Sequence, residues 1–561
     1  MPEVAAPMVK ATKGEARSDK RMGKNVLWIM ADQLRWDYLG CFGARHIDTP
    51  HLDRLAAKGV RFNKTYVQSP ICGPSRMSFY TGRYVRSHGS TWNNVALKIG
   101  EMTLGDHLRE IGVKCSLVGK THMTPDKEGM ARLGIEPDST IGALASECGF
   151  EVIVRDDGTN HTDYPHRHGE DYDAYLRAHG FDGDNPWEEW ANSAEGENGE
   201  LLTGWLLKNS HLPARVPAEH SETAWLTTRG IEFIQAQGDQ PWLCHLSYIK
   251  PHWPYLAPAP YNDMYGPGDL PPVVRSNAER ETDHPLMKAW LDTRVCQSFS
   301  RDEVRDRVAP AYMGLIKQLD DEMGRLFDFL ESTGRMEDTM IVFCSDHGDN
   351  MGDHWLGEKD LFYDCSARIP LIVYDPRPEA EATRGTLTDA LVEGIDLVPT
   401  FLQYFGGEAK PHIIEGRSLQ PLLHGKPTDW RAFAVSEYDY STRQARLDLG
   451  LDQADARLTM IFDGRWKMVH VEGFAPLLYD LETDPDELSD RAPDPACAAH
   501  LQRLNAAHFH WARQHHARTT VTGAQMDLRA KRQEPHGIYI GLWDEADLAA
   551  TNKILPDKAS G

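Results

Sequence analysis

The chain has 561 residues, too many for a single compact core, so its length predicts one large domain with a smaller partner, or several domains. Hydrophobic residues make up 41% and charged residues 26%, a globular composition that excludes wholesale disorder. No apolar run approaches the roughly 18 residues that a membrane span needs. The net charge of −24 argues against nucleic acid and anionic membranes as partners, because both would repel it.

Two further features concern the compartment of the protein. Residues 1–23 carry charge but no apolar stretch, so they are interpreted as a leader segment and not as a secretory signal. The nine cysteines are scattered and odd in number, which is not typical of a disulfide framework. Free thiols favour a reducing compartment, and the predicted localisation is cytoplasmic.

Helical and apolar segments alternate along the first three quarters of the chain. The run Asn25–Asp32 is almost continuously apolar and predicts a buried parallel strand. Three helix–strand pairs follow it: 103–113 with 114–120, 222–237 with 241–249, and 313–333 with 339–346, where Gly334 marks the end of the last helix. This alternation predicts an α/β fold with a largely parallel central sheet.

The pattern changes near residue 427, and this change divides the chain. Residues 24–426 are predicted to form the large domain, with an acidic insertion, rich in Trp, Gly and His, over about 126–217. In it, His161, His166 and His168 are interpreted as solvated loop histidines. Residues 427–518 predict short antiparallel strands, with a hairpin at 462–466 and a helix at 496–515. The tail 519–561 is interpreted as an arm for self-association.

Polar residues follow the predicted strands at their carboxyl ends, where ligands bind in such sheets. Asp32 and Gln33 close one strand, and Asp346 and His347 close another. Singly, each is more commonly a cap or turn residue, but together at one sheet edge they predict a cage for one divalent cation. Cations and proton carriers suited to a tetrahedral oxyanion gather at the same edge: Arg76, Lys120, His122, His252 and Lys359.

Cys72 lies in the segment ICGPSRMSFYTGR and has two interpretations, an inert thiol in a turn or a chemically active residue. The segment resembles the signature of the type I sulfatases of the alkaline phosphatase superfamily. That signature, Cys-x-Pro-Ser-Arg followed by Thr-Gly, is matched by Cys72, Pro74, Ser75, Arg76, Thr81 and Gly82. The segments ADQ, VGKTH, KPHWPY, SDHGD, GEKDLFYDCSARIPLIV and LYDLETDPDEL also resemble the family, in its order, from Lys24 to about Asp490.

The resemblance implies a fold and a cofactor. The fold is an alkaline-phosphatase-like three-layer sandwich with a mostly parallel sheet, plus a smaller C-terminal α+β domain with a short antiparallel sheet. Family members hold one divalent metal ion, here by Asp32, Cys72, Asp346 and His347. In the family, a separate formylglycine-generating enzyme reads the short motif and oxidises the cysteine, here Cys72, to formylglycine.

The resemblance also implies a mechanism. An oxygen of the hydrated formylglycine gem-diol, activated by the metal, attacks sulfur and gives a sulfated hemiacetal. The second hydroxyl, deprotonated by His122, then restores the aldehyde and expels sulfate. Lys359 and His252 neutralise or protonate the departing oxygen. Arg76 supports the diol and the metal ligands, Lys120 bridges diol and sulfate, and Asn93, favoured over Asn94 by its spacing from Cys72, contacts the anion.

Two departures from the common sulfatase pattern bear on the substrate. Asp32-Gln33 replaces a pair of acids and Asp346-His347 replaces Asp-Asn, and both changes resemble the phosphonate monoester hydrolase branch. Exchanging a carboxylate for an imidazole shifts the expected metal from calcium towards manganese or zinc. Gln33 is expected to hydrogen-bond the substrate and not to bind the metal. Lys120 and His122, however, match the residues of the arylsulfatases. The phosphonate hydrolases tend to carry tyrosine and threonine at these two positions.

Three functions follow. The favoured one is an arylsulfatase-like hydrolase of small sulfate esters, with side activity on phosphonate and phosphate esters. The alternative is a phosphonate monoester hydrolase or phosphodiesterase with the same machinery. The third is an anion-binding protein whose Cys72 stays unmodified. A homodimer or higher homo-oligomer is expected from the extra terminal segments.

Overall fold

The computed structural model describes residues 24–161, 169–514, 516–531, 543–544 and 546–547. The predicted leader, His166 and His168, and most of the predicted C-terminal arm lie outside these residues. No described helix is long and apolar enough to cross a membrane. All nine cysteines lie in the described part and are free thiols.

An eight-stranded sheet forms the centre of the molecule, in the order β10-β2-β9-β8-β1-β7-β3-β4. Its strands are β1 (Asn25–Ala31), β2 (Val60–Tyr66), β3 (Lys114–Gly119), β4 (Glu151–Arg155), β7 (Trp242–Tyr248), β8 (Thr339–Ser345), β9 (Leu371–Tyr374) and β10 (Leu387–Glu393). All neighbouring pairs are parallel except those of β9, which is antiparallel to β2 and β8. The prediction of a mostly parallel sheet is confirmed.

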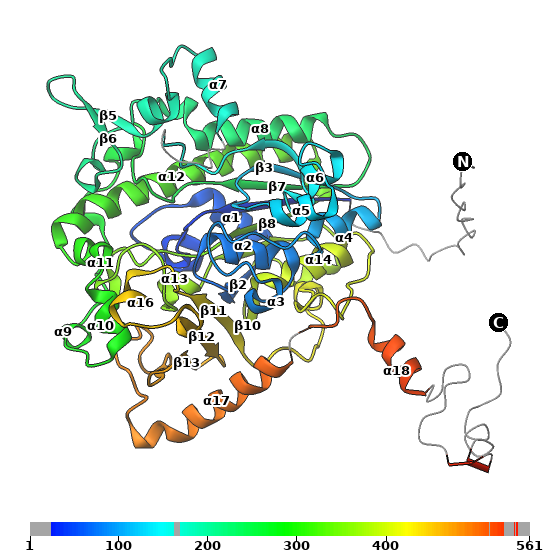
Figure 1. Cartoon of the computed structure of the whole chain (residues 1–561). Coiled ribbons are helices and arrows are strands. Elements are labelled where there is room, and N and C mark those ends of the chain that lie inside the picture. Colours follow the sequence, from blue (N-terminus) through cyan, green and yellow to red (C-terminus); the bar gives the residue numbers. More distant parts are fainter. Residues whose placement is uncertain (1–23, 162–168, 515, 532–542, 545, 548–561) are drawn as a thin grey trace.

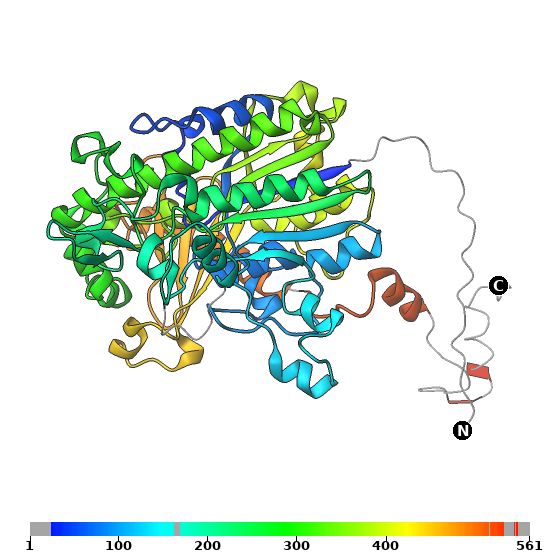
Figure 2. The same cartoon turned by 90° about the horizontal axis from the view of Figure 1, so that it is seen from above.

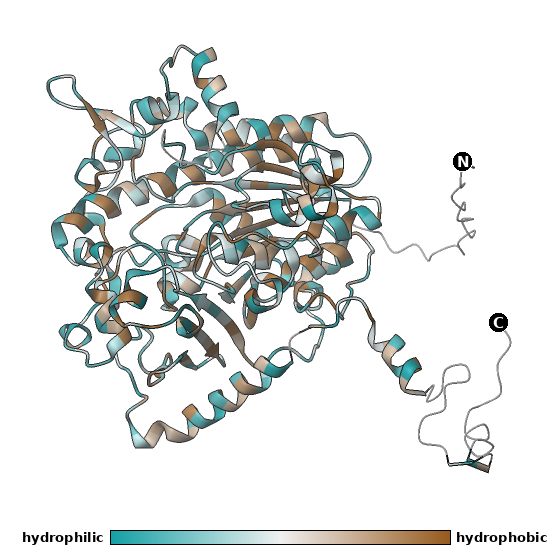
Figure 3. Ribbon diagram, in the orientation of Figure 1, coloured by the Kyte–Doolittle hydropathy of each residue, from teal (hydrophilic) through white to brown (hydrophobic). Residues whose placement is uncertain are grey.

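Helices cover both faces of this sheet, which makes three layers (Figures 1 and 2). Successive side chains of a strand point to opposite faces, and β1 buries both sets. Leu27 and Ile29 share one core with α1 (Pro50–Lys58), α8 (Glu222–Ala236) and α12 (Asp302–Ser332). Trp28 and Met30 share the other core with α2 (Cys72–Thr81), α4 (Leu104–Glu110) and α14 (Leu397–Tyr404). Figure 3 shows the hydrophobic residues concentrated along the central strands.

Two elements differ from the sequence prediction. The helix expected over 313–333 begins earlier, at Asp302, and carries Pro310 inside it. Its first turns consist mostly of charged residues, so the sequence shows no apolar periodicity there. The helix ends before Gly334, as predicted, and this glycine has a φ of 70°. The predicted insertion over 126–217 is not wholly outside the core, because β4 pairs with β3 as an edge strand of the central sheet. Three consecutive exposed residues of β4 gave no buried-strand signal.

The C-terminal region forms a four-stranded antiparallel sheet of β11 (Ala434–Asp439), β12 (Arg457–Phe462), β13 (Trp466–Val471) and β14 (Leu477–Asp480). The hairpin predicted at 462–466 joins β12 to β13, and the predicted helix is α17 (Ala498–Arg513). One face of the sheet packs against α17 through a cluster that includes Met468 and Leu504. The tail contains one further helix, α18 (Gly523–Lys531).

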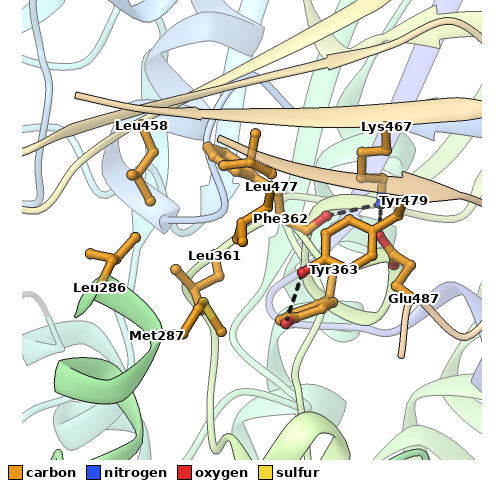
Figure 4. Close-up of a pocket in the computed structure, with 11 residues that line it drawn as sticks. Leu286, Met287, Leu361, Phe362, Tyr363, Leu458, Lys467, Leu477, Tyr479 and Glu487 are labelled. Carbon is orange, nitrogen blue, oxygen red and sulfur yellow. Dashed lines mark hydrogen bonds and ion pairs between the residues drawn. The ribbon is translucent and has the colours of Figure 1, made fainter. Parts of the chain in front are cut away.

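The opposite face of the small sheet packs against the segment Leu361–Tyr363 of the large domain (Figure 4). A buried lysine, Lys467, lies at the edge of this apolar contact. Its Nζ is 2.5 Å from Asp364 and 2.7 Å from Glu487. Burial lowers the pKa of Lys467, but these two carboxylates outweigh it and raise the pKa. The amine is therefore charged and joins the two domains by buried ion pairs.

We expect Lys467→Met to destabilise the protein strongly. The substitution keeps the apolar stem but leaves Asp364 and Glu487 without their buried cation, a loss that typically costs about 3–5 kcal/mol. Thermal and urea unfolding would measure the change. The matched control is Arg465→Met, because the Arg465 guanidinium is half exposed and pairs with Asp480 and Glu482 at the surface, where water screens the charges. An equal loss of unfolding free energy in the two variants would contradict a stabilising role for the buried ion pairs of Lys467.

Candidate active site

Four parallel strands end at one edge of the sheet, and each delivers polar groups there. The strand register aligns Ala31 of β1 with Tyr248 of β7 on one side and with Ser345 of β8 on the other. The residues that follow these strands and β3 are therefore neighbours in space: Asp32 and Gln33, Lys120 and His122, His252, and Asp346 and His347. The convergence predicted from the sequence is present.

Cys72 is the first residue of α2 and is fully buried among these strand ends. Its Sγ lies 3.0 Å from His347 Nε2, 3.0 Å from Lys359 Nζ and 3.8 Å from Asp32 Oδ1. Burial alone would raise the pKa of the thiol, yet Lys359, His347 and Lys120 lower it well below its ordinary value. Position 72 is thus surrounded by cations that favour an anion there.

Arg76 lies one helical turn after Cys72 and fixes both predicted metal-binding acids. Its Nε donates to Asp346 Oδ2 at 2.7 Å and its Nη2 to Asp32 Oδ2 at 3.1 Å. Its Nη1 donates to the carbonyl of Lys120 and to Ser247 Oγ, both at 2.8 Å. These contacts use one oxygen of each acid and leave the Oδ1 atoms facing His347.

Asp32 also pairs with Lys120, whose Nζ lies 2.6 Å from Oδ2. Burial and the neighbouring Cys72 raise the pKa of Asp32, but cations that include Lys120 and Arg76 hold it below its ordinary range. Asp32 is therefore ionised. Its carboxylate faces cations on one side and position 72 on the other, as the metal-binding assignment requires.

The residues predicted to bind the metal fit a divalent cation. One donor atom from each of Asp32, Cys72, Asp346 and His347 lies within 4.8 Å of all the others, and all four residues are buried. The Nδ1 of His347 lies 2.9 Å from the Gly348 carbonyl, which fixes a proton on Nδ1 and leaves the Nε2 lone pair towards the other donors. Two carboxylate oxygens, an imidazole nitrogen and the group at position 72 suit manganese or zinc.

A second group of donors, His51, Asp320 and Asp321, also lies close together. Its acids are already engaged, because Lys317 pairs with both and Asp320 accepts the backbone N–H groups of His51 and Leu52. This group caps α1 and is not assigned as a metal site.

Gln33 lies behind the pocket and contacts Lys359. Its amide nitrogen donates to Asp349 Oδ2 at 2.5 Å and to Tyr255 Oη at 3.1 Å, and its Oε1 accepts from Lys359 Nζ at 3.1 Å. Gln33 is fully buried and lies outside the residues that line the pocket. Gln33 is therefore placed to hold Lys359, and the substrate-binding role predicted for it stays a prediction.

Lys359 also contacts His252, whose Nε2 lies 3.0 Å from Nζ. The Nδ1 of His252 lies 2.6 Å from the Trp253 carbonyl, so Nδ1 carries the proton and Nε2 accepts from the lysine. Burial and Lys359 lower the pKa of His252 to about 3. Lys359 is thus the cation of this pair and His252 is its neutral partner.

A pocket of about 530 Å³ opens above this centre. Lys120, His122, His252 and Lys359 line its floor, and Asn93 lines its side with its Oδ1 held by the Gly73 N–H at 2.8 Å. That contact orients Asn93, whereas Asn94, which also lines the pocket, is more exposed. Aromatic and polar residues from distant segments form the remaining wall: Trp92, Thr159, His161, Trp205, Trp253, Glu358 and Arg443.

The predicted metal-binding residues lie together, Asn93, Lys120, His122, His252 and Lys359 line the pocket, and Gln33 and Arg76 lie outside its lining. His161, interpreted from the sequence as a solvated loop residue, instead lines the pocket. Sequence reasoning missed Tyr255, Asp349, Arg443 and the three tryptophans. A high tryptophan content near the predicted insertion was the only available signal for the wall. His88, Asp353 and His354 lie outside the pocket lining and bond to Ser78, Arg35 and Glu279 respectively.

We expect manganese or zinc to stabilise the folded protein through Asp32, Asp346 and His347. A cation that binds only the folded state adds about 2.7 kcal/mol at 100 times its dissociation constant, which appears as a higher melting temperature than in EDTA. Asp346→Asn should lose most of this shift. Asp321→Asn is the matched control from the second donor group and should keep it, so a shift lost equally in both variants would contradict the site.

Comparison with known proteins agrees with this geometry. The sulfatase family model matches residues 24–407, and the model of the C-terminal region of N-sulphoglucosamine sulphohydrolase matches residues 352–512. The multifunctional alkaline phosphatase superfamily protein PehA of Trinickia caryophylli is 34% identical, over 89% of this chain and 97% of its own. An arylsulfatase of Clostridium perfringens is 29% identical, over 84% of this chain and 90% of its own.

Solved structures show the same relationship. The phosphonate monoester hydrolase of Silicibacter pomeroyi superposes with a TM-score of 0.77 at 29% identity, over 88% of this chain and 96% of its own. That of Agrobacterium radiobacter gives 0.74 at 30% identity, over 86% and 96%. The fold, the motif around Cys72 and these likenesses agree, and the chain belongs to the sulfatase family.

Proposed function

We propose that this protein is an arylsulfatase-like sulfuric ester hydrolase that uses formylglycine derived from Cys72 and one divalent metal ion. The observation that carries the proposal is the position of Cys72 Sγ, between the donor set of Asp32, Asp346 and His347 and the amine of Lys359. A nucleophile in this place has a metal site on one side and a cation for the leaving group on the other.

The cations of the site suit a sulfate group despite the net charge of −24. Lys120 and Lys359 both line the floor of the pocket, and the buried Arg76 lies directly behind it. Two opposite unit charges about 4 Å apart gain roughly 4 kcal/mol at an effective dielectric near 20. Acidic residues on the distant surface are screened by salt, so they oppose this attraction only weakly.

Each side chain has a distinct task in the proposed reaction. A bound divalent cation would lower the pKa of a hydroxyl at position 72 and withdraw charge from the ester oxygens. Lys120 and Asn93 orient the sulfate above position 72, while Lys359 neutralises the oxygen that leaves with the alcohol. His122 removes a proton from the second hydroxyl at position 72, so that the C–O bond to sulfate breaks and the aldehyde returns.

His252 serves this scheme as a neutral acceptor. Because its Nε2 accepts from Lys359, it holds the amine in place without competing for charge. Gln33 Oε1 fixes the same amine from another side at 3.1 Å. Lys359 therefore supplies the positive charge at the departing oxygen. Lys359 and His252 do not share this task equally, in contrast to the expectation from the sequence.

Phosphonate monoester hydrolysis is the second candidate. It is supported by the two phosphonate monoester hydrolase structures, with TM-scores of 0.77 and 0.74, and by Asp346-His347 at the metal site. Lys120 and His122 favour the sulfatase assignment, because these residues match the arylsulfatase pattern. Side activity on phosphonate and phosphate esters is part of the proposal, since all these substrates present a tetrahedral anion to the same cations.

The proposal also includes partners and a compartment. A formylglycine-generating enzyme would modify Cys72 before α2 buries it, because Cys72 is fully buried in the folded chain. Nine free cysteines suit a reducing cytoplasm. Self-association as a homodimer or larger homo-oligomer remains a proposal based on the terminal segments.

The first test combines a mass measurement with an activity panel. The tryptic peptide Thr65–Arg76 should carry the lower mass of an aldehyde in place of the thiol. The purified protein should hydrolyse 4-nitrophenyl sulfate faster than phenyl phosphonate monoesters, and Cys72→Ala should lower kcat by at least about 10⁴-fold, as expected for a lost nucleophile.

Cys148→Ala is the control, because Cys148 is buried away from the pocket beside Met123. A faster phosphonate reaction would favour the second candidate. If Cys72 is unmodified and the protein hydrolyses neither ester, the result would favour the third function, an anion-binding protein.

A further inference from the structure

Lys359 sits in a segment with an unusual backbone. Glu358 has φ 55°, Asp360 has φ 93° and Leu361 has φ 55°, and none of the three is glycine. Side chains of L-residues crowd the backbone in this left-handed region. Such a run persists only where the surrounding structure holds it, and it commonly occurs at functional sites.

The large domain holds one side of this segment through Asn350. The Asn350 N–H donates to the carbonyl of Glu358 at 2.6 Å, and its Nδ2 donates to the carbonyl of Lys359 at 3.3 Å. Both bonds engage the backbone before Asp360. They leave the following peptide, and the direction of the Lys359 side chain, to be fixed by other contacts.

The small domain holds the other side through the carboxylate of Asp360. Its Oδ1 accepts from Tyr438 Oη at 2.8 Å and from Arg443 Nη2 at 2.6 Å. Tyr438 belongs to β11, and Arg443 precedes the short helix α16 (Gln444–Asp448). Asp360 is only 8% exposed, so the carboxylate of this ion pair is shielded from water, whereas the Arg443 side chain is partly exposed to the pocket.

The Arg443 guanidinium is itself fixed on several sides. Its Nε donates to Tyr438 Oη at 3.2 Å, and its Cζ lies 4.8 Å from the centre of the Trp92 ring. Trp92 and Arg443 both line the substrate pocket, whereas Tyr438 is buried behind them and does not. The two residues on Asp360 therefore differ in their access to a substrate.

We propose that Tyr438 and Arg443 of the small domain are positioning residues that hold Asp360, and through it keep the amine of Lys359 beside position 72. The inference rests on the proposed function, in which Lys359 neutralises the leaving oxygen. A small shift of the segment would carry Nζ away from Cys72, His252 and Gln33, which it contacts at 3.0–3.1 Å. The small domain thus completes the active site of the large one.

The leaving group provides a test that separates positioning from general structural damage. An ester of phenol needs more help for its departing oxygen than an ester of 4-nitrophenol, whose ring already stabilises the negative charge. Loss of a well-placed Lys359 should therefore lower kcat far more for the phenyl ester. A merely destabilised enzyme would lose activity on both esters by the same factor.

The experiment measures kcat and KM for phenyl and 4-nitrophenyl sulfate, or the matching phosphonate monoesters if these react faster. Arg443→Lys keeps the charge but loses the fork that reaches Asp360 and Tyr438. We expect kcat to fall about 100-fold for the phenyl ester and less than about 10-fold for the 4-nitrophenyl ester, the scale of loss for a slightly misplaced catalytic group. Tyr438→Phe should show the same selectivity with a smaller loss.

Two further variants complete the design. Asp360→Asn combined with Arg443→Lys should lose no more than the worse single variant, because both would act through one contact. Arg446→Lys is the matched control, since Arg446 lies in α16 outside the pocket lining and its guanidinium donates to the carbonyl of Leu451. It should leave both esters unchanged. Circular dichroism and melting temperature would confirm that each variant folds.

Several outcomes would overturn the inference. Equal losses on the two esters, or additive losses in the double variant, would contradict positioning. A raised KM in Arg443→Lys with no effect of Tyr438→Phe would instead assign Arg443 to direct substrate binding. If the wild-type protein turns over none of these esters, the proposed function fails and this inference fails with it.

Discussion

The site depends on one buried guanidinium. Arg76 reaches the ends of four strands, because it bonds to Asp32 after β1, to the carbonyl of Lys120 after β3, to Ser247 in β7 and to Asp346 after β8. Only a planar fork with several donors can make these contacts at once, so lysine would not replace it. The same contacts turn the free oxygens of both acids towards His347. Without Arg76, the buried Asp346 would lose its guanidinium partner and Asp32 would be left with Lys120 as its paired cation.

This arrangement explains how an acidic protein can offer a cationic pocket. Arg76 and Lys120 pair with Asp32, so this acid is ionised and available to a metal. Lys359 contacts position 72 directly, interacts electrostatically with Asp32 and Glu358 as well, and lowers the pKa of Cys72. The charge that faces a substrate is therefore set by local pairing, and the net charge of the chain has little influence on it.

The sequence predicted those parts of the site that follow from topology. Parallel strands place their carboxyl ends at one edge, so Asp32, Lys120, His252 and Asp346 could be grouped from local patterns alone. The contacts of the Gln33 amide could not be predicted, because Tyr255 and Asp349, which orient it, are more than 200 residues away. The pocket wall combines segments around Trp92, Trp205, Trp253 and Arg443, and no spacing rule links them. The strand β4 could not be predicted either, because an exposed edge strand has no continuous apolar run.

The two domains are linked at the segment that carries Lys359. The two family models overlap between residues 352 and 407, so the chain gives no clean boundary there. The structure gives the physical reason: Asp360 bonds to the small domain, Leu361–Tyr363 pack under its sheet, and Asp364 pairs with the buried Lys467. These consecutive contacts stabilise the interface and bend the backbone next to the active amine. Stability of the small domain and geometry of the active site therefore depend on the same few residues.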